Sequence, residues 1–523
     1  MTIKQVYQLL ERSTEKNPEK IAIYHRNTGI SYGHLLTYAR NFAEHILSIG
    51  LTPGFRGGIL TNDPVEYISA YFGIQMAGGI AVGLNTQTTK RTLTYHVNDC
   101  EMELLIVDKR YINLVNETMP NVTGIRSIIS ENVDELTDDP KFLKTKTSKI
   151  FKRKPSNLKL PFRNSCDIAQ IIYTSGTTGK PKGVMLRHAN LIANTKSIIS
   201  YLKIDSIDKV MAVLPFFYSY GNSVMLTHIC QGATLVVNQN LVYPNVILNE
   251  MEKYDVTGFS GVPSTFALLL HRSNIEQYRF PSLRYITQAG APMSPALTQR
   301  LQNAFPGVDI YIMYGQTEAS ARLSYLPPKD LMRKAGSIGI PIPGVELRVL
   351  DEDGKEVPIG KIGEIVARGE NIMAGYWNSP DESQKVLRSE GLRTGDLAYQ
   401  DEDGYFYIVS RKSDIIKSGS HRIAPKEIED VVMEHESISE AAVVGIEDEV
   451  LGEAIWLFVV LIPGKNLTSL ELKRHCSYNL PAYKVPHRIY QLDCLPKTAT
   501  GKIKKNVLKT KALKIIKDKA RKK

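Results

Sequence analysis

Apolar residues recur along the first half of the chain at two different spacings. At residues 31–49 and again at 65–76 they return every three or four positions, which predicts two amphipathic helices, and residues 1–8 resemble the start of another. Short apolar runs at 79–84, 104–107, 209–214, 233–237 and 283–287 predict buried strands. The repeated alternation of strand and helix predicts an α/β domain with largely parallel sheets.

The pattern changes after Arg333, where short strand-like runs are separated by turn residues. The sequences at 351–354 and 401–404 both read Asp-Glu-Asp-Gly, and neither continues with the ligand spacing of a calcium loop, so we interpret them as hairpin turns. A second α/β pattern follows Arg411, with a helix at 425–435 and strands at 441–444 and 456–460. We therefore expect an N-terminal domain of several α/β parts and a small β-rich part at 1–411, and a small mobile α/β domain at 412–523.

Composition places the chain among folded proteins of more than one domain. It has 523 residues, of which 43% are hydrophobic and 23% charged. The five cysteines are scattered, with no Cys-x-x-Cys pair, which argues against a zinc site and favours a reducing compartment. The amino terminus lacks the pattern of a signal peptide, and the longest apolar run, near 455–462, is too short to cross a bilayer. We expect a cytoplasmic protein without a transmembrane segment.

The formal net charge of +11 favours anionic partners such as nucleotides, coenzyme A, an acidic carrier protein or a lipid surface. Residues 504–523 are mostly lysine and arginine. A solvated tail and a binding patch are both compatible with this composition. No motif indicates a nucleic-acid partner.

The segment at 171–184 contains the most informative chemistry. A β-rich run leads into a loop of hydroxyl residues, glycines and lysines, whose backbone N–H groups and hydroxyls can surround phosphate oxygens. The loop is not a Walker A motif, because Thr174 stands at the first required glycine and Pro181 follows the Gly-Lys pair. The candidate phosphate-binding residues are Thr174, Ser175, Gly176, Thr177, Thr178, Gly179 and Lys182.

This segment resembles the Thr-Ser-Gly-Thr-Thr-Gly-x-Pro-Lys-Gly signature of the adenylate-forming superfamily of acyl-CoA synthetases, luciferases and peptide-synthetase adenylation domains. In that superfamily the loop holds the β- and γ-phosphates of ATP. The run Tyr314-Gly315-Gln316-Thr317-Glu318 resembles its second signature. By that resemblance Tyr314 stacks on adenine, Thr317 contacts the α-phosphate and Glu318 helps to hold Mg²⁺, while the turn Gly290-Ala291-Pro292 lines the adenine pocket.

Three later positions match the family's remaining nucleotide residues. Asp396 matches the carboxylate that accepts the ribose hydroxyls, and Arg411 its ribose and phosphate partner. Lys502, in the run at 495–503, matches the catalytic lysine. A compact ammonium group can stabilise the negative charge that develops on the α-phosphate and the bridging oxygen. The resemblance implies that the small domain closes to deliver Lys502 and then rotates about a hinge near Ser413, where relatives have Asp or Lys.

The aromatic run at 214–221 resembles the motif that flanks the acyl carboxylate. Tyr218 stands where many ligases have histidine, and it is either a gate with a hydroxyl or a core residue. Gly221 occupies the place of the Asp that amino-acid-activating relatives need, which counts against an α-amino acid substrate. The acyl pocket is expected around Phe216, Tyr218, Gly261, Val262 and Gln288.

The resemblance implies an enzyme that uses ATP and Mg²⁺ to convert a small carboxylic acid to acyl-AMP and then passes the acyl group to a thiol. Ser420 replaces the glycine that usually lets pantetheine pass, with Gly419 one position earlier. The acceptor is therefore either coenzyme A or, as an alternative, the phosphopantetheine arm of an acyl carrier protein. A third hypothesis, a non-catalytic nucleotide sensor, is opposed by the intact Glu318, Asp396, Arg411 and Lys502. Neither the acid nor the oligomeric state is indicated.

Overall fold

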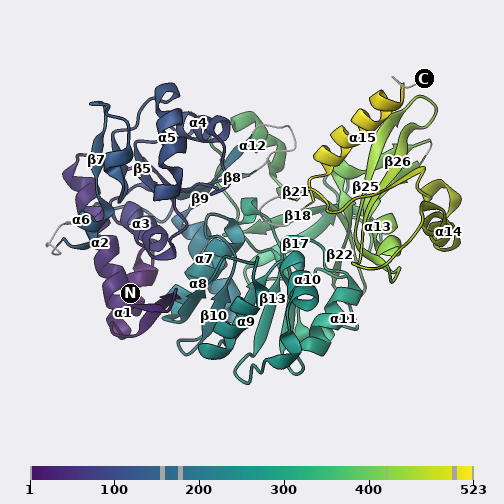
Figure 1. Ribbon diagram of the computed structural model, residues 1–523, viewed down its shortest axis with the longest axis horizontal. Helices are drawn as coiled ribbons and strands as arrows, with labels where there is room; N and C mark the ends of the chain where they lie inside the picture. Colours follow the sequence, from purple (N-terminus) through teal and green to yellow (C-terminus); the bar gives the residue numbers. More distant parts are fainter. Residues whose placement is uncertain (1–2, 154–158, 175–180, 420, 498–502, 521–523) are drawn as a thin grey trace.

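The computed structural model describes residues 3–153, 159–174, 181–419, 421–497 and 503–520. Two large sheets flanked by helices and a smaller β-rich part form the body of the molecule, and a small α/β domain lies beside it at the right of Figure 1. The predicted fold class, a large α/β region followed by a smaller α/β domain, is confirmed.

The first large sheet has nine strands in the order β16-β15-β14-β13-β12-β10-β11-β1-β2. Its central strands are parallel, so the segments that follow β10, β12, β13 and β14 all leave from the same edge. The strands are β1 (Ile21–His25), β2 (Thr28–Ser31), β10 (Lys209–Ala212), β11 (Thr234–Val237), β12 (Gly258–Gly261), β13 (Tyr285–Gln288), β14 (Asp309–Tyr314), β15 (Ser324–Leu326) and β16 (Ile340–Pro341).

The second large sheet has eight strands in the order β19-β9-β8-β4-β3-β5-β6-β7. Its parallel part ends at β8, and β9 and β19 then add in antiparallel fashion. The strands are β3 (Arg56–Leu60), β4 (Ile80–Gly83), β5 (Leu104–Val107), β6 (Ser127–Ile129), β7 (Leu143–Thr145), β8 (Ile168–Thr174), β9 (Lys182–Arg187) and β19 (Gly375–Tyr376).

The helices that cover these sheets begin where the sequence supplies caps. The Ser31 hydroxyl accepts a hydrogen bond from the His34 N–H at the start of α2, and Asp63 caps α3 ahead of Pro64. The two helices pack closely, because a Cβ added at Gly73 would lie 2.4 Å from Phe42 Cβ. The helices of the larger part are α1 (Gln8–Lys16), α2 (Tyr32–Ser48), α3 (Pro64–Met76), α4 (Lys90–Asp99), α5 (Ile112–Thr118), α6 (Thr147–Phe151), α7 (His188–Leu202), α8 (Ser219–Gln231), α9 (Pro244–Lys253), α10 (Pro263–Arg272), α11 (Pro295–Ala304) and α12 (Pro380–Val386).

A five-stranded antiparallel sheet forms the predicted β-rich part. Its strands are β17 (Val345–Leu350), β18 (Gly363–Gly369), β20 (Leu387–Arg388), β21 (Gly391–Gln400) and β22 (Phe406–Arg411). The turn predicted at 401–404 joins β21 to β22, and the Gly404 N–H donates to the Asp401 carbonyl at 3.0 Å. The 351–354 segment also turns, with the Gly354 N–H donating to the Asp351 carbonyl at 3.3 Å.

The small domain has a core of its own. Its hydrophobic clusters draw on residues from Ile416 onward, whereas the large clusters of the body end at Ile408. The boundary at 411/412 falls between these cores and stays a prediction. The strands are β23 (Ile416–Ser418), β24 (His421–Ile423), β25 (Ile438–Asp448), β26 (Gly452–Leu461) and β27 (Arg488–Gln491), and the helices are α13 (Pro425–Met433), α14 (Ser469–Asn479) and α15 (Lys505–Ala520).

The helix expected to start within residues 1–8 begins at the last of these positions, Gln8. The described backbone just before it forms a turn in which the Gln8 N–H donates to the Gln5 carbonyl. The other predicted helices and strands differ from the observed ones mainly at their ends. Among the described helices none is both long and apolar enough to cross a membrane.

Candidate functional site

The candidate phosphate loop connects two antiparallel strands. Thr174 at the end of β8 pairs with Lys182 at the start of β9, so the connection is a hairpin, unlike the strand-to-helix turn of a Walker A motif. Ser175, Gly176, Thr177, Thr178 and Gly179 lie outside the described residues.

The Lys182 side chain is directed to the first turn of α12 and to the neighbouring strand β19. Its ammonium group forms an ion pair with Glu382 and lies 5.0 Å from the centroid of the Tyr376 ring. Tyr376 stands beside β9 because β19 pairs with that strand, Tyr376 opposite Val184. The hairpin is thereby joined to a segment nearly two hundred positions later in the chain.

The second signature forms a tight turn after β14. Gly315 is required there, since an added Cβ would lie 2.0 Å from the Ala321 carbonyl oxygen. The Thr317 hydroxyl lies 3.3 Å from the Ser219 hydroxyl at the start of α8. The Tyr376 hydroxyl donates to Glu318 Oε1 at 2.8 Å. Burial, reinforced by Glu318, raises the pKa of Tyr376 far above its usual range, so this hydroxyl remains a donor at neutral pH.

Asn371 stabilises the turn that contains Glu318 through hydrogen bonds to residues 319–322. Its side-chain Nδ2 donates to the backbone carbonyl of Ala319 at 3.2 Å and to that of Arg322 at 2.9 Å. The backbone carbonyl of Asn371 accepts a hydrogen bond from the Ser320 hydroxyl at 2.7 Å. Ser320 has a φ of 63°, a conformation that costs free energy and that these bonds hold in place.

Tyr314, Asp396 and Arg411 form a connected group. The Tyr314 hydroxyl donates to Asp396 Oδ2 at 2.6 Å, and Arg411 Nε lies 2.9 Å from Asp396 Oδ1. Asp396 and Arg411 are opposite each other in the β21–β22 pairing. The Asp396 side chain is buried while that of Arg411 is 45% exposed. The adjacent Asp396 carboxylate raises the pKa of Arg411, which favours the charged pair.

The aromatic motif follows β10 at the same sheet edge. Phe216 is buried against Tyr67, with ring centroids 6.0 Å apart, and the Tyr218 hydroxyl accepts a hydrogen bond from Asn85 Nδ2 at 3.0 Å. Burial raises the pKa of Tyr218 to about 12. An added Cβ at Gly221 would lie 2.1 Å from the Pro215 carbonyl oxygen, so this backbone has no room for an aspartate.

Gly261, Gln288 and the turn after Gln288 lie one strand further along. Gly261 at the end of β12 is opposite Gln288 at the end of β13. Gln288 Nε2 donates to the Ala291 carbonyl at 2.7 Å, and the side chain is fully buried. Gly290 has a φ of 93°, which allows the chain to turn before Pro292.

The hinge and tunnel candidates lie on the path into the small domain. Ser413 is in a 3₁₀ turn, Lys412–Asp414, and its hydroxyl donates to Asp414 Oδ1 at 3.2 Å. Gly419 has a φ of 59° at the turn between β23 and β24. Ser420 and Lys502 lie outside the described residues.

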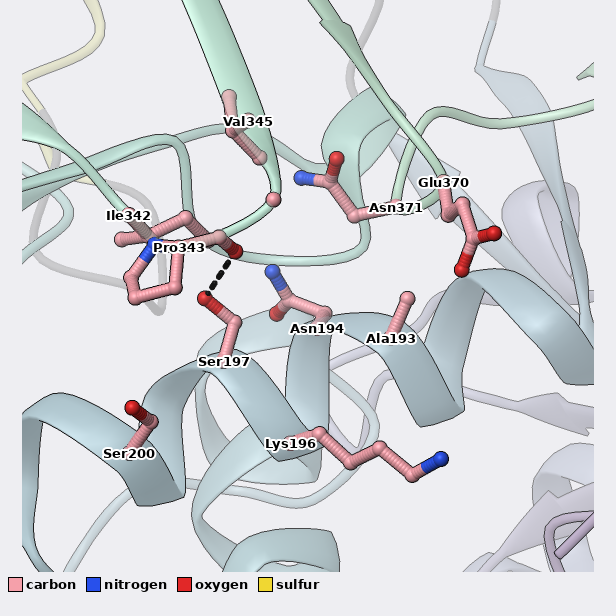
Figure 2. Close-up of a pocket in the computed structure, with 11 residues that line it drawn as sticks. Ala193, Asn194, Lys196, Ser197, Ser200, Ile342, Pro343, Val345, Glu370 and Asn371 are labelled. Atoms are coloured by element: carbon pink, nitrogen blue, oxygen red, sulfur yellow. Dashed lines mark hydrogen bonds between the residues drawn. The ribbon is translucent and has the colours of Figure 1, made fainter. Parts of the chain in front are cut away.

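A groove of about 520 Å³ lies between α7 and the loop at 342–345. Figure 2 shows the residues that line it. Lys196 and Glu370 are the charged residues among those that line it, and the Ser197 hydroxyl donates to the Pro343 carbonyl at 2.8 Å. Asn371, which holds the Glu318 turn, forms part of its wall. None of the nucleotide-site residues predicted from the sequence lines this groove, so it lies behind the candidate site and is not part of it.

Three of these side chains were not anticipated from the sequence: Tyr376, Asn371 and Asn85. A Gly-Tyr-Trp run at 375–377, which includes one of the chain's two tryptophans, was a signal for Tyr376. Asn371 and Asn85 are single amides in loops, and no sequence pattern distinguishes them.

Comparison with known proteins identifies the family. Residues 10–377 match the AMP-binding enzyme family, and residues 427–502 match the AMP-binding enzyme C-terminal domain. The chain belongs to the AMP-binding enzymes. It is 31% identical over 525 residues to a long-chain-fatty-acid–CoA ligase of Bacillus subtilis (strain 168), across 96% of this chain and 93% of that one. The corresponding ligase of Escherichia coli O6:H1 is 30% identical, across 96% and 94%.

Solved structures of AMP-binding enzymes share the whole fold. An anthranilate CoA ligase in complex with anthranoyl-AMP has a TM-score of 0.89 and 27% identity, with 98% of each chain covered. The o-succinylbenzoate CoA synthetase of Bacillus subtilis, in complex with ATP and magnesium ion, has a TM-score of 0.83 and 27% identity, with 95% and 98% covered. The resemblance to the adenylate-forming superfamily and the prediction of an AMP-forming acid–thiol ligase are confirmed.

Proposed function

We propose that this AMP-forming acid–CoA ligase joins a fatty-acid-type carboxylate to AMP and then transfers the acyl group to coenzyme A. In the first step a carboxylate oxygen attacks the α-phosphorus of ATP and pyrophosphate leaves; in the second the thiol displaces AMP. The observation that carries the proposal is a chain of contacts around the turn that contains Glu318. Tyr376 contacts both Glu318 and Lys182, and the Thr317 hydroxyl lies 3.3 Å from that of Ser219 in the aromatic motif. Tyr314, immediately before the turn, donates to Asp396. The groups proposed to bind phosphate, ribose and acid are thus linked by direct contacts.

The nucleotide would be held by residues already fixed without it. Asp396 is positioned by Tyr314 and Arg411 and keeps acceptor capacity for ribose hydroxyls, because each carboxylate oxygen accepts more than one hydrogen bond. The Tyr314 ring and the turn at Gly290 would line the adenine. Thr174, Lys182 and the loop between them would hold the outer phosphates, and Thr317 the α-phosphate.

Glu318 fits a magnesium site of the kind found with nucleotides. Mg²⁺ is commonly bound by one or two carboxylates together with phosphates and water. Among the described residues no cluster of three or more His, Cys, Asp or Glu could hold a metal by itself, which agrees with a cation bound jointly with ATP. The ion would neutralise phosphate charge. Lys502 would stabilise the charge that develops on the α-phosphate.

The acid is proposed to be an apolar monocarboxylate. The residues assigned to its pocket, Phe216, Gly261, Val262 and Gln288, carry no charge, so they offer no partner for a second carboxylate. At Gly221 the backbone leaves no room for the aspartate that an amino-acid substrate requires. Relatives at 30–31% identity across nearly the whole chain are named long-chain-fatty-acid–CoA ligases, which supports a long aliphatic chain.

The thiol is proposed to enter past Gly419 and Ser420 after rotation near Ser413. Coenzyme A is preferred as the acceptor because the relatives found by sequence are named CoA ligases. The alternative acceptor is the phosphopantetheine arm of an acyl carrier protein, and the thioester assay described below distinguishes the two.

Carboxylate-dependent exchange of pyrophosphate into ATP tests the first step. We expect exchange with medium and long aliphatic acids, little with dicarboxylic acids and none with α-amino acids. Exchange with no acid would favour the nucleotide-sensor hypothesis, and a preference for dicarboxylic acids would refute the apolar pocket. Thioester formation with coenzyme A, compared with a panel of holo carrier proteins, tests the second step; saturation only with a carrier protein would refute coenzyme A as the acceptor.

A further inference from the structure

The positive charge of the chain is concentrated at one end. Residues 504–523 contain ten lysines and arginines and one aspartate, so they carry +9 of the chain's formal +11. Residues 1–503 are therefore close to neutral. The nucleotide motifs do not account for this distribution, because the last of them, at 495–503, ends before these residues begin.

Helix α15 is anchored to the small domain along one face. Leu508 and Ala512 are fully buried, and they pack in the cluster that contains Trp456 and Phe458 of β26. The Lys505 ammonium group lies 2.8 Å from Glu429 Oε1 on α13. Figure 1 shows α15, in yellow, along the small domain and running outward toward the C terminus at the edge of the molecule. One face of the helix is anchored, so the others face solvent.

The exposed part of α15 combines lysines with aliphatic side chains. Val507, Leu513 and Ile516 are 43%, 47% and 41% exposed. Leu513 and Ile516 are three positions apart and share one side of the helix, and Lys509 precedes Leu513 by four positions on that side. The pattern is that of a basic helix that lies at a lipid–water interface, with aliphatic side chains entering and ammonium groups at the headgroups.

We propose that α15 binds the surface of an anionic lipid bilayer. This inference goes beyond the proposed function and does not depend on the identity of the acid. Nine of the ten basic residues in 504–523 are lysines, and the segment contains no aromatic residue. Nucleic-acid surfaces favour arginine and stacked aromatic rings, whereas lysines with aliphatic neighbours suit phosphatidylserine-type headgroups.

The magnitude of the effect follows from the number of lysines. Each lysine near an anionic membrane strengthens binding by roughly fivefold at moderate ionic strength. Reversing three of them should therefore weaken binding by at least about 100-fold. The attraction should also fall steeply with salt, because charges are screened beyond about 8 Å at physiological ionic strength.

The test is sedimentation of the full-length protein with vesicles of phosphatidylcholine alone and of phosphatidylcholine with phosphatidylserine, at low and high salt. We expect binding only to the anionic vesicles at low salt. The triple variant Lys509→Glu/Lys511→Glu/Lys514→Glu should lose at least about 100-fold in affinity. The matched control Lys329→Glu/Lys355→Glu/Lys361→Glu changes the net charge equally at exposed positions of the larger domain and should bind nearly as tightly as the wild type.

A second pair of variants separates insertion from a diffuse ionic attraction. Leu513→Ser/Ile516→Ser should weaken vesicle binding while its salt dependence stays unchanged. All variants should keep wild-type pyrophosphate exchange with a water-soluble acid, so loss of folding or of catalysis is distinguished from loss of docking. Wild-type affinity of the first triple variant for anionic vesicles, or absence of wild-type binding to them, would overturn the proposal. Binding to duplex DNA or to an acidic protein but not to vesicles would overturn it in favour of that partner.

Discussion

The hydrogen bond from Tyr376 to Glu318 allows a direct test of the proposed metal site. The variant Tyr376→Phe removes one oxygen atom and keeps the aromatic ring. The contact between the ring and the Lys182 ammonium group, 5.0 Å from the ring centroid, is therefore retained. The lost bond is 2.8 Å long and joins a buried donor to a carboxylate. Hydrogen bonds to charged groups contribute about 1.5–3 kcal/mol. Mutation of a residue that hydrogen-bonds to a metal ligand typically lowers metal affinity or activity by about 10–100-fold.

We therefore expect the Mg²⁺ concentration for half-maximal exchange to rise by about 10–100-fold in Tyr376→Phe at saturating ATP and acid. The assay is pyrophosphate exchange at a series of free Mg²⁺ concentrations. The pKa of Tyr376 is raised by burial and by Glu318, so the hydroxyl stays protonated and the difference from wild type should persist to about pH 9.

Tyr405→Phe is the matched control. Its hydroxyl donates to the carboxylate of buried Asp330, to Oδ2 at 2.6 Å, but it lies immediately before β22 rather than beside the site. This variant should lower the melting temperature without changing the Mg²⁺ requirement. An unchanged requirement in Tyr376→Phe would refute the role of Glu318 in holding the metal, and an equal shift in both variants would show that the effect is general destabilisation.

Four further predictions concern single residues and, in one case, a hydrogen-bonded pair. Asp396→Asn removes the charge of the proposed ribose acceptor. The loss of about 1.5–3 kcal/mol in a charged hydrogen bond should raise the KM for ATP by roughly 10–100-fold. A KM within error of wild type would contradict the ribose assignment. Asn85→Ala and Tyr218→Phe each break the same hydrogen bond, so their effects on kcat/KM for the acid should be non-additive in the double variant, and full additivity would show independent roles. Lys502→Ala should slow adenylation by roughly 10²–10³ and leave thioester formation from supplied acyl-AMP intact, whereas equal loss of both would make the lysine structural. Burial raises the pKa of Glu66 from 4.5 to about 7, so ionising this carboxyl destabilises the folded state by up to about 3 kcal/mol as the pH rises from 4.5 to above 7. Glu66→Gln should therefore raise the melting temperature at pH 8, and this gain should shrink toward pH 4.5. A difference in melting temperature that does not depend on pH would contradict the raised pKa.

The sequence was sufficient for features that depend on contiguous residues. The run at 104–107 is a strand with the predicted ends, β5. It pairs in parallel with β3 and β6 and is buried along its length, and such strands are apolar throughout. Asp396 and Arg411 were assigned separately, and they proved to be neighbours because a turn brings β22 back along β21. Motif residues of this kind are predictable where each lies in its own recognisable pattern.

The side chains that position the motifs could not be predicted in this way. Tyr376 reaches Glu318 because the two-residue strand β19 pairs with β9, and two residues show no periodicity. Asn85 reaches Tyr218 across 133 positions, from the end of a strand in the other sheet. Such contacts follow from the order of strands and the packing of the two sheets, which local sequence does not determine.

In the sequence, the Asp396–Arg411 pair and Lys502 lie on opposite sides of the turn that leads into the small domain, so their proposed contacts with the nucleotide should differ during the reaction. The pair is fixed by the β21–β22 register within the β-rich part, immediately before the 3₁₀ turn at Lys412–Asp414 that leads into the small domain. A movement of the small domain beyond that turn would leave the pair in place, so it would hold the adenosine part of ATP and of acyl-AMP alike. Lys502 belongs to the segment beyond the turn and would act only when that domain is closed. Asp396→Asn should therefore impair both half-reactions, whereas Lys502→Ala impairs one, and this contrast measures domain alternation without a structure of either state. If Asp396→Asn slowed adenylation alone, the pair would not hold the nucleotide through both steps, and the division of labour between the two domains would be wrong.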